Sequence, residues 1–234
     1  MKSFYPLLST IILLLMGGCG DPLVGGMTAD EMFSDKKLAQ LAVAASKGDQ
    51  DLVILLINNG VDPNGMGLDG ISPLIWAVGA SDTEGIEALI KGGADPDYQA
   101  ENGISAVSLA AGARDPALLE VLLNNGADPN SRGERDRPAL HIAIEQFRIK
   151  NIKRLIDSGA DVNAKDASNR TAAEFAAGFG RYDVVVYLLE KGLTEGLDDL
   201  ARVADFRKVI SGSEQEKWRE KTIQILGANK EVQK

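Results

Sequence analysis

The side chains best suited to chemistry are few in this sequence. Its 234 residues include a single cysteine, Cys19, and a single histidine, His141. A structural zinc site takes about four ligands, mostly Cys and His, so these two residues cannot build one. A nucleophilic Cys–His pair would have to join the extreme N-terminus to the middle of the chain. We therefore expect no metal, no cofactor and no thiol nucleophile.

The sequence motifs of other common active sites are also missing. No glycine-rich phosphate loop follows a strand, and no Gly-x-Ser-x-Gly turn is present. Asp198 and Asp199 are adjacent, and adjacent side chains diverge on a helix, so a solvated surface explains them better than a carboxylate pair does. We predict that the protein is not an enzyme. The alternative is a hydrolase whose site carries no recognised motif.

Charge narrows the class of partner. The formal net charge is −9, and because Lys2 is the only charged side chain before Cys19, the remainder of the chain carries −10. Nucleic-acid binding needs a basic face that neutralises phosphates, so we expect no nucleic-acid partner. The same balance argues against a broad electrostatic attraction to anionic lipid.

The first 18 residues have the parts of an export signal. Lys2 supplies the positive start, residues 7–16 form a short apolar run, and Gly17 and Gly18 are small residues before a cleavage point. A membrane-spanning helix needs about 20 apolar residues, so this run is too short to span comfortably. Residues 1–18 are therefore predicted to be a signal peptide.

Cys19 directly follows Met16, Gly17 and Gly18, and this segment resembles the lipobox of bacterial lipoproteins, with Met16 where that family usually has leucine. The resemblance implies that Cys19 is acylated and anchors the protein to the periplasmic face of the envelope. Gly20 rather than aspartate after the cysteine implies the outer membrane. The alternative is an ordinary cleaved signal followed by an unrelated cysteine. Residues 19–34 lack periodicity and are expected to be a flexible tether.

The middle of the chain repeats with a step of thirty-three residues. Glycines recur at this step, and so do an alanine and two apolar positions. These columns are Gly60, Gly93, Gly126, Gly159 and Gly192; Ala44, Ala77, Ala110, Ala143 and Ala176; Leu56, Leu89, Leu122, Leu155 and Leu188; and Val53, Ile86, Leu119, Ile152 and Val185.

Elementary physics assigns a role to each column. Val53, Leu56 and Ile57 lie on one face of a helix. The glycine that follows ends the helix in a left-handed conformation, and the Asp-Pro-Asn that comes next forms a turn. The alanine column indicates a first helix that a neighbouring repeat approaches closely. One helix pair cannot bury its apolar face alone, so stacked repeats must share a core.

The segment Ser72-Pro73-Leu74-Ile75-Trp76-Ala77 resembles the Thr-Pro-Leu-His-x-Ala motif of ankyrin repeats, and Leu140-His141-Ile142-Ala143 keeps its second half. The resemblance covers about residues 35–195. It implies an all-α solenoid of about five helix-turn-helix repeats with short β-hairpin-like loops, in which His141 bonds backbone between repeats. Apolar residues in 196–234 indicate two helices of a C-terminal cap, the first with Leu197, Leu200, Phe206 and Ile210, the second with Trp218, Ile225 and Leu226.

Ankyrin stacks bind protein partners on a concave face made by hairpin tips and first helices. Carried over by column, the resemblance gives partner-binding candidates, among which the later tips are rich in arginine. They are Met66, Leu68, Asp69, Ile71, Gln99, Glu101, Asn102, Arg132, Glu134, Arg135, Arg137, Gln146, Lys165, Ser168, Arg170 and Phe179. Arginine pairs well with carboxylates, so we hypothesise that the partner presents an acidic patch to Arg132, Arg135, Arg137 and Arg170. The alternative is a solvated charged rim.

The combined architecture resembles the immunity proteins that accompany type VI secretion lipase effectors. That resemblance implies a monomeric, lipid-anchored inhibitor that binds and neutralises a phospholipase. The alternative is an envelope scaffold, similar to periplasmic ankyrin proteins that support catalase or the assembly of another envelope factor.

Overall fold

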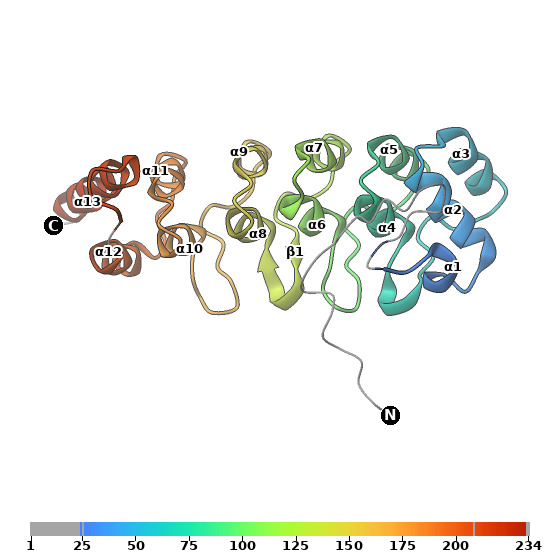
Figure 1. Ribbon diagram of the computed structural model, residues 1–234, viewed down its shortest axis with the longest axis horizontal. Coiled ribbons are helices and arrows are strands. Elements are labelled where there is room, and N and C mark those ends of the chain that lie inside the picture. Colours follow the sequence, from blue (N-terminus) through green and yellow to red (C-terminus); the bar gives the residue numbers. More distant parts are fainter. Residues whose placement is uncertain (1–23, 25, 208, 233–234) are drawn as a thin grey trace, which may run out of the picture.

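The computed structural model describes residues 24, 26–207 and 209–232, so the predicted signal peptide and Cys19 lie outside the described residues. The chain forms a line of antiparallel helix pairs (Figure 1). The inner helices lie in the row next to the hairpin loops: α2 (Lys36–Ser46), α4 (Pro73–Ala80), α6 (Ala106–Gly112), α8 (Ala139–Glu145), α10 (Ala172–Gly178) and α12 (Leu197–Phe206). The outer helices form the second row: α3 (Gln50–Asn58), α5 (Thr83–Lys91), α7 (Pro116–Asn124), α9 (Ile149–Asp157), α11 (Tyr182–Glu190) and α13 (Glu214–Val232).

The loops between repeats project from the inner row as hairpins (Figure 1). One hairpin contains a two-stranded antiparallel sheet of β1 (Arg132–Gly133) and β2 (Arg137–Pro138), joined by the short 3-10 turn η2 (Glu134–Asp136). The corresponding turn of an earlier hairpin is η1 (Leu68–Gly70). The predicted all-α solenoid with short hairpin loops and a helical C-terminal cap is confirmed.

The glycine column closes the outer helices as predicted. Its five members have φ between +87° and +98°, a conformation that costs other residues free energy because of their Cβ. In the first repeat the N–H of Val61, just beyond Gly60, donates to the carbonyl of Leu56 at 3.1 Å. This bond satisfies a carbonyl that the end of a helix would otherwise leave unpaired.

The alanine and leucine columns form the core. Every alanine of the column is at most 2% exposed, and the leucines are at most 8% exposed. A methyl group at the alanine positions lets neighbouring inner helices approach closely, and the branched side chains fill the layer between the two rows. The stacked repeats therefore share one continuous core, as the period predicts.

A ladder of hydrogen bonds joins the turns of successive repeats. Its members are Asn64, Asp97, Asn130 and Asn163, each of which accepts a bond from a backbone N–H of the next repeat at 2.7–2.8 Å. The three asparagines also donate through Nδ2 to the carbonyl of the next glycine in the glycine column, at 2.9–3.5 Å. The ladder therefore fixes the spacing between neighbouring repeats.

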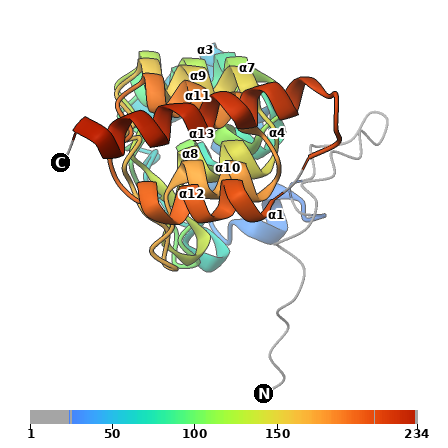
Figure 2. The same ribbon diagram turned by 90° about the vertical axis from the view of Figure 1, so that its left-hand side faces the viewer.

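The C-terminal helices extend both rows by one pair (Figure 2). Leu200 is fully buried, and the side-chain oxygen of Gln215 on α13 accepts from the backbone N–H of Tyr182 at the start of α11, at 2.9 Å. The predicted apolar face is only partly correct, because Phe206 is 90% and Ile210 is 82% exposed. Phe206 is the last residue of α12 and Ile210 lies in the segment between α12 and α13, and the described part of the chain leaves both side chains uncovered.

The expected tether over residues 19–34 is wrong for its second half. Helix α1 (Ala29–Met32) begins with a capping box between Thr28 and Glu31, and Phe33, only 1% exposed, packs edge-to-face on Trp76. Further back, Val24 lies against Gly79 of α4, where an added Cβ would come within 2.7 Å of it. The chain is therefore folded onto the first two repeats from Val24 onward.

Candidate functional site

His141 is a structural residue. Its side chain is fully buried, and its Nε2 lies 3.0 Å from the carbonyl oxygen of Arg170 in the next repeat, as predicted. Burial lowers its pKa below the ordinary value of 6.5, because the charged form loses solvation, while the bond to Arg170 opposes the shift. Among the described residues its Nδ1 has no hydrogen-bond partner. A neutral, inaccessible imidazole of this kind links two repeats and has no access to a substrate.

The predicted partner-binding residues divide by exposure. The exposed ones are Met66, Leu68, Asp69, Gln99, Glu101, Arg135, Gln146, Ser168, Arg170 and Phe179, and the partly exposed ones are Asn102, Arg132, Glu134, Arg137 and Lys165. Ile71 is a correction, because it is 8% exposed and belongs to the core. Its apolar side chain points inward at the base of the hairpin, directly before the start of α4, and it cannot contact a partner.

The arginines expected to meet an acidic partner are mostly engaged within the chain. Arg132 pairs with Asp136 and also donates to the carbonyl of Lys165. Arg137 pairs with Glu145. No ion-pair partner of Arg135 is found in the described part of the chain.

Arg170 is held by Asp166, with an ion pair of 2.8 Å. Burial raises the pKa of Asp166, but the hydrogen bonds from Arg170 and Ser168, together with the charge of Arg170, outweigh it and hold that pKa below its ordinary value. Three of the four hairpin arginines therefore already neutralise nearby carboxylates, and the set makes a weaker acidic-patch receptor than its spacing suggests.

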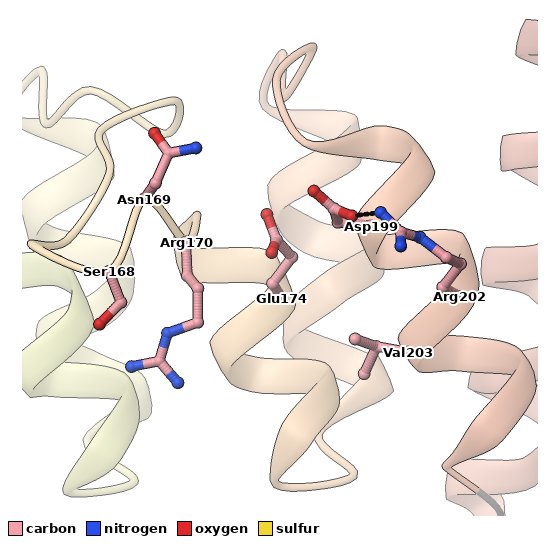
Figure 3. A pocket seen from close by; sticks show the side chains of 7 residues that line it. All are labelled: Ser168, Asn169, Arg170, Glu174, Asp199, Arg202 and Val203. Atoms are coloured by element: carbon pink, nitrogen blue, oxygen red, sulfur yellow. Dashed lines mark hydrogen bonds and ion pairs between the residues drawn. The ribbon is translucent and has the colours of Figure 1, made fainter.

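An open hollow of about 370 Å³ lies beside this hairpin (Figure 3). Its lining comes from the hairpin, α10 and α12: Ser168, Asn169, Arg170, Glu174, Asp199, Arg202 and Val203. Most of its charged groups have internal partners, since Arg202 pairs with Asp199 and the Glu174 carboxylate accepts from the backbone N–H and the hydroxyl of Thr171. The hollow therefore offers few free charges to a small ligand.

The most distinctive exposed feature of the inner row is a cluster of Phe147, Phe175 and Phe179, called here the Phe cluster. The ring centroids of Phe147 and Phe179 are 5.4 Å apart, and those of Phe175 and Phe179 are 5.2 Å apart, both edge-to-face. Phe147 is 49% and Phe179 is 41% exposed. Aromatic rings on rigid elements supply large contact areas at little entropic cost, so this cluster is suited to anchoring a protein partner.

Phe147 has a strained backbone as well as an exposed ring. Its φ is +56°, in the left-handed region that bulky residues avoid. Gly48, Ser81 and Gly180, which share its column, adopt the same conformation with φ of +67°, +67° and +73°. A phenylalanine at a position suited to glycine costs about 1–2 kcal/mol, and strain of this kind concentrates at functional sites.

Charge is distributed unevenly along the stack. Residues 19–113 contain 4 basic and 14 acidic side chains, whereas residues 114–234 contain 20 of each, and all eleven arginines belong to the second part. The Phe cluster lies in the second part. The negative charge of the protein thus belongs to the early repeats, and the face around the Phe cluster is electrostatically distinct from them.

A family model for ankyrin repeats, in three copies, matches residues 41–133 and again residues 107–199. The chain belongs to the ankyrin-repeat family. No curated protein matches it. Ankyrin repeats are protein-interaction modules, so the chain is a protein-interaction module. Among the described residues no group of His, Asp or Glu is arranged to hold a metal ion, and no described helix is long and apolar enough to cross a membrane.

Sequence reasoning found Phe179 in the ankyrin stack but missed Phe147 and Phe175. A signal for Phe147 existed in the repeat pattern, because this bulky residue occupies the column of Gly48 and Gly180. The contact with Phe179 follows from the same register, since that residue directly precedes Gly180 in the next repeat.

Proposed function

We propose that this ankyrin protein is an envelope immunity protein that binds and neutralises a phospholipase effector of type VI secretion, anchored through acylated Cys19. The observation that carries the binding role is the exposed Phe cluster on the inner row of a rigid stack. The export signal and the lipobox resemblance support the location. A toxin that attacks phospholipid acts at the membrane, and an inhibitor tethered there has a high effective concentration.

The test begins with the full acylated chain, purified in detergent and used to capture partners from envelope extract. The captured protein is then assayed for release of fatty acid from phospholipid vesicles, with and without added ankyrin protein. We expect it to be a phospholipase that loses nearly all activity at equimolar inhibitor. A captured partner that stays fully active in the complex contradicts the immunity role. If that partner is a catalase or an assembly factor, the envelope scaffold is the better account.

A further inference from the structure

The residue that precedes each outer helix, at the turn from the inner helix, changes from aspartate to arginine along the stack. In the first three repeats the outer helix begins with Asp49, Asp82 or Asp115, and each carboxylate caps its helix by accepting a backbone N–H at 2.9–3.0 Å. In the fourth and fifth repeats Arg148 and Arg181 occupy this position, and neither side chain caps its helix. In α9 the loss of an aspartate cap costs about 0.5–2 kcal/mol, whereas in α11 the side-chain oxygen of Gln215 accepts the backbone N–H of Tyr182 instead.

The two arginines lie beside the exposed rings. Arg148 directly follows Phe147, and the Arg181 guanidinium lies over the Phe147 ring, 5.8 Å from its centroid. Two features that lower stability, the missing side-chain cap of α9 and the left-handed Phe147, therefore occur at the same turn. Strained backbone clusters at binding sites, so this turn is a candidate binding surface.

The cations of this surface differ in how they are neutralised. Arg181 is paired with Asp183 at 2.7 Å. Arg148 makes one bond, from Nε to the carbonyl of Gly112 at 2.9 Å, and no described carboxylate pairs with it. Arg114, exposed and one repeat before Phe147 in the same column, has no ion-pair partner within the described residues. Positive charge that the chain leaves unneutralised therefore flanks the rings, in a protein whose net charge is −9.

We propose that the Phe cluster, with Arg114 and Arg148, is the docking surface for an acidic segment of the protein partner. The partner places an apolar side chain against Phe147 and Phe179, and adjacent carboxylates pair with the two arginines. An apolar anchor ringed by charge pairs is the arrangement in which a few residues carry most of the binding free energy. This inference rests on the proposed function only in requiring a protein partner, and it locates that partner on the turns rather than on the hairpin tips.

The experiment selects binders from a random-peptide phage library on the full acylated chain in detergent. We expect enriched peptides that combine an aromatic or aliphatic residue with neighbouring Asp or Glu. Their binding should weaken as NaCl rises from about 0.05 to 0.5 M, because exposed charge pairs are screened. Enrichment of basic peptides, or no enrichment, overturns the proposal.

Two variants separate binding from folding. Phe147→Gly removes the ring at a position whose backbone suits glycine, and Arg148→Asp restores the cap of the first three repeats. We expect each to weaken binding of the selected peptides by roughly tenfold or more, with a melting temperature that is not lowered. Leu55→Ala is the control, because Leu55 is 55% exposed on α3, far from the cluster, and its binding should be unchanged. Peptides that bind both variants as tightly as the unchanged chain overturn the proposal.

The two proposals fail in different ways. A captured phospholipase that is inhibited equally by the unchanged chain and by Phe147→Gly retains the immunity role and overturns the docking surface. Acidic peptides that depend on Phe147 and Arg148, together with a captured partner that is not inhibited, support the surface and reject the immunity role.

Discussion

Asparagine occupies three of the four ladder positions that join the turns, and the fourth is Asp97. Its Oδ1 accepts the N–H of Asp128 at 2.7 Å, as the asparagines do for their own partners. Its second carboxylate oxygen takes the place of the amide nitrogen that donates to the next glycine carbonyl in the other repeats. From the register of the other repeats we expect this oxygen to face the carbonyl of Gly126, so that two acceptors oppose each other. Asp97→Asn should replace this repulsion with a hydrogen bond.

The expected gain is the net worth of one hydrogen bond, about 0.5–1.5 kcal/mol, and the exposure of the site favours the lower end. For a chain of this size each kcal/mol shifts the melting temperature by about 2–4 °C, so the gain is about 1–4 °C. Thermal and urea unfolding followed by circular dichroism at neutral pH measure it. The reverse change, Asn64→Asp, should lose stability by a similar amount.

Removal of a negative charge also reduces repulsion in an acidic protein, and Asp95→Asn controls for this effect. Asp95 lies in the same turn, and within the described chain its side chain accepts only from the N–H of Asp97, a role that asparagine can fill. If Asp97→Asn is no more stable than Asp95→Asn, the ladder argument is refuted.

Three further changes test the fold. Gly85→Ala should destabilise the stack by about 3 kcal/mol or more, because the added Cβ would lie 1.8 Å from the carbonyl oxygen of Ala45. Gly178→Ala is the control, because its added Cβ meets nothing within 4 Å and should raise the free energy of unfolding by about 0.5–1 kcal/mol. Equal melting temperatures for the two variants would contradict the close approach at Gly85. Asn151→Ala should cost about 1–3 kcal/mol in urea unfolding, because its buried amide donates to three carbonyls at the end of α6. The pKa of His141 is lowered in the folded chain, so the unfolded chain takes up a proton near pH 6.5 and the folded chain only at lower pH. The free energy of unfolding should therefore fall as the pH drops below 6.5. His141→Gln should flatten this part of the pH profile, and an unchanged slope argues against a buried neutral imidazole.

The sequence alone predicts the repeats because each column reports a local requirement. A helix must end at Gly60, an alanine must allow close approach at Ala44, and His141 must reach the next repeat. Such requirements recur every thirty-three residues, and this repetition allows them to be recognised in the sequence. The four-residue helix α1 has no period, and its burial depends on meeting Trp76 some forty residues later. The expected tether therefore missed it.

The candidate site was harder to predict for a related reason. Column positions identify which residues can face a partner, but not which of them form ion pairs with carboxylates of the chain itself. Arg137 meets Glu145 within its own repeat, and Arg170 meets Asp166 four residues earlier. Side-chain pairings of this kind depend on the rotation of each hairpin, which the period does not encode. The Phe cluster arises from residues one step out of register in adjacent repeats, a relation that inspection of single columns overlooks.

The attachment of Val24 to α4 limits how far Cys19 can lie from the folded repeats. Five residue steps separate Val24 from Cys19, and whatever their conformation they cannot extend beyond about 18 Å. An acyl group at Cys19 would therefore hold Val24, and the second repeat on which it packs, within about 18 Å of the lipid surface. The protein could then bind only partners that come close to that surface. An insertion between Cys19 and Val24 would lengthen this connection and widen the zone in which the protein can bind a partner, while the described contacts of the fold stay as they are.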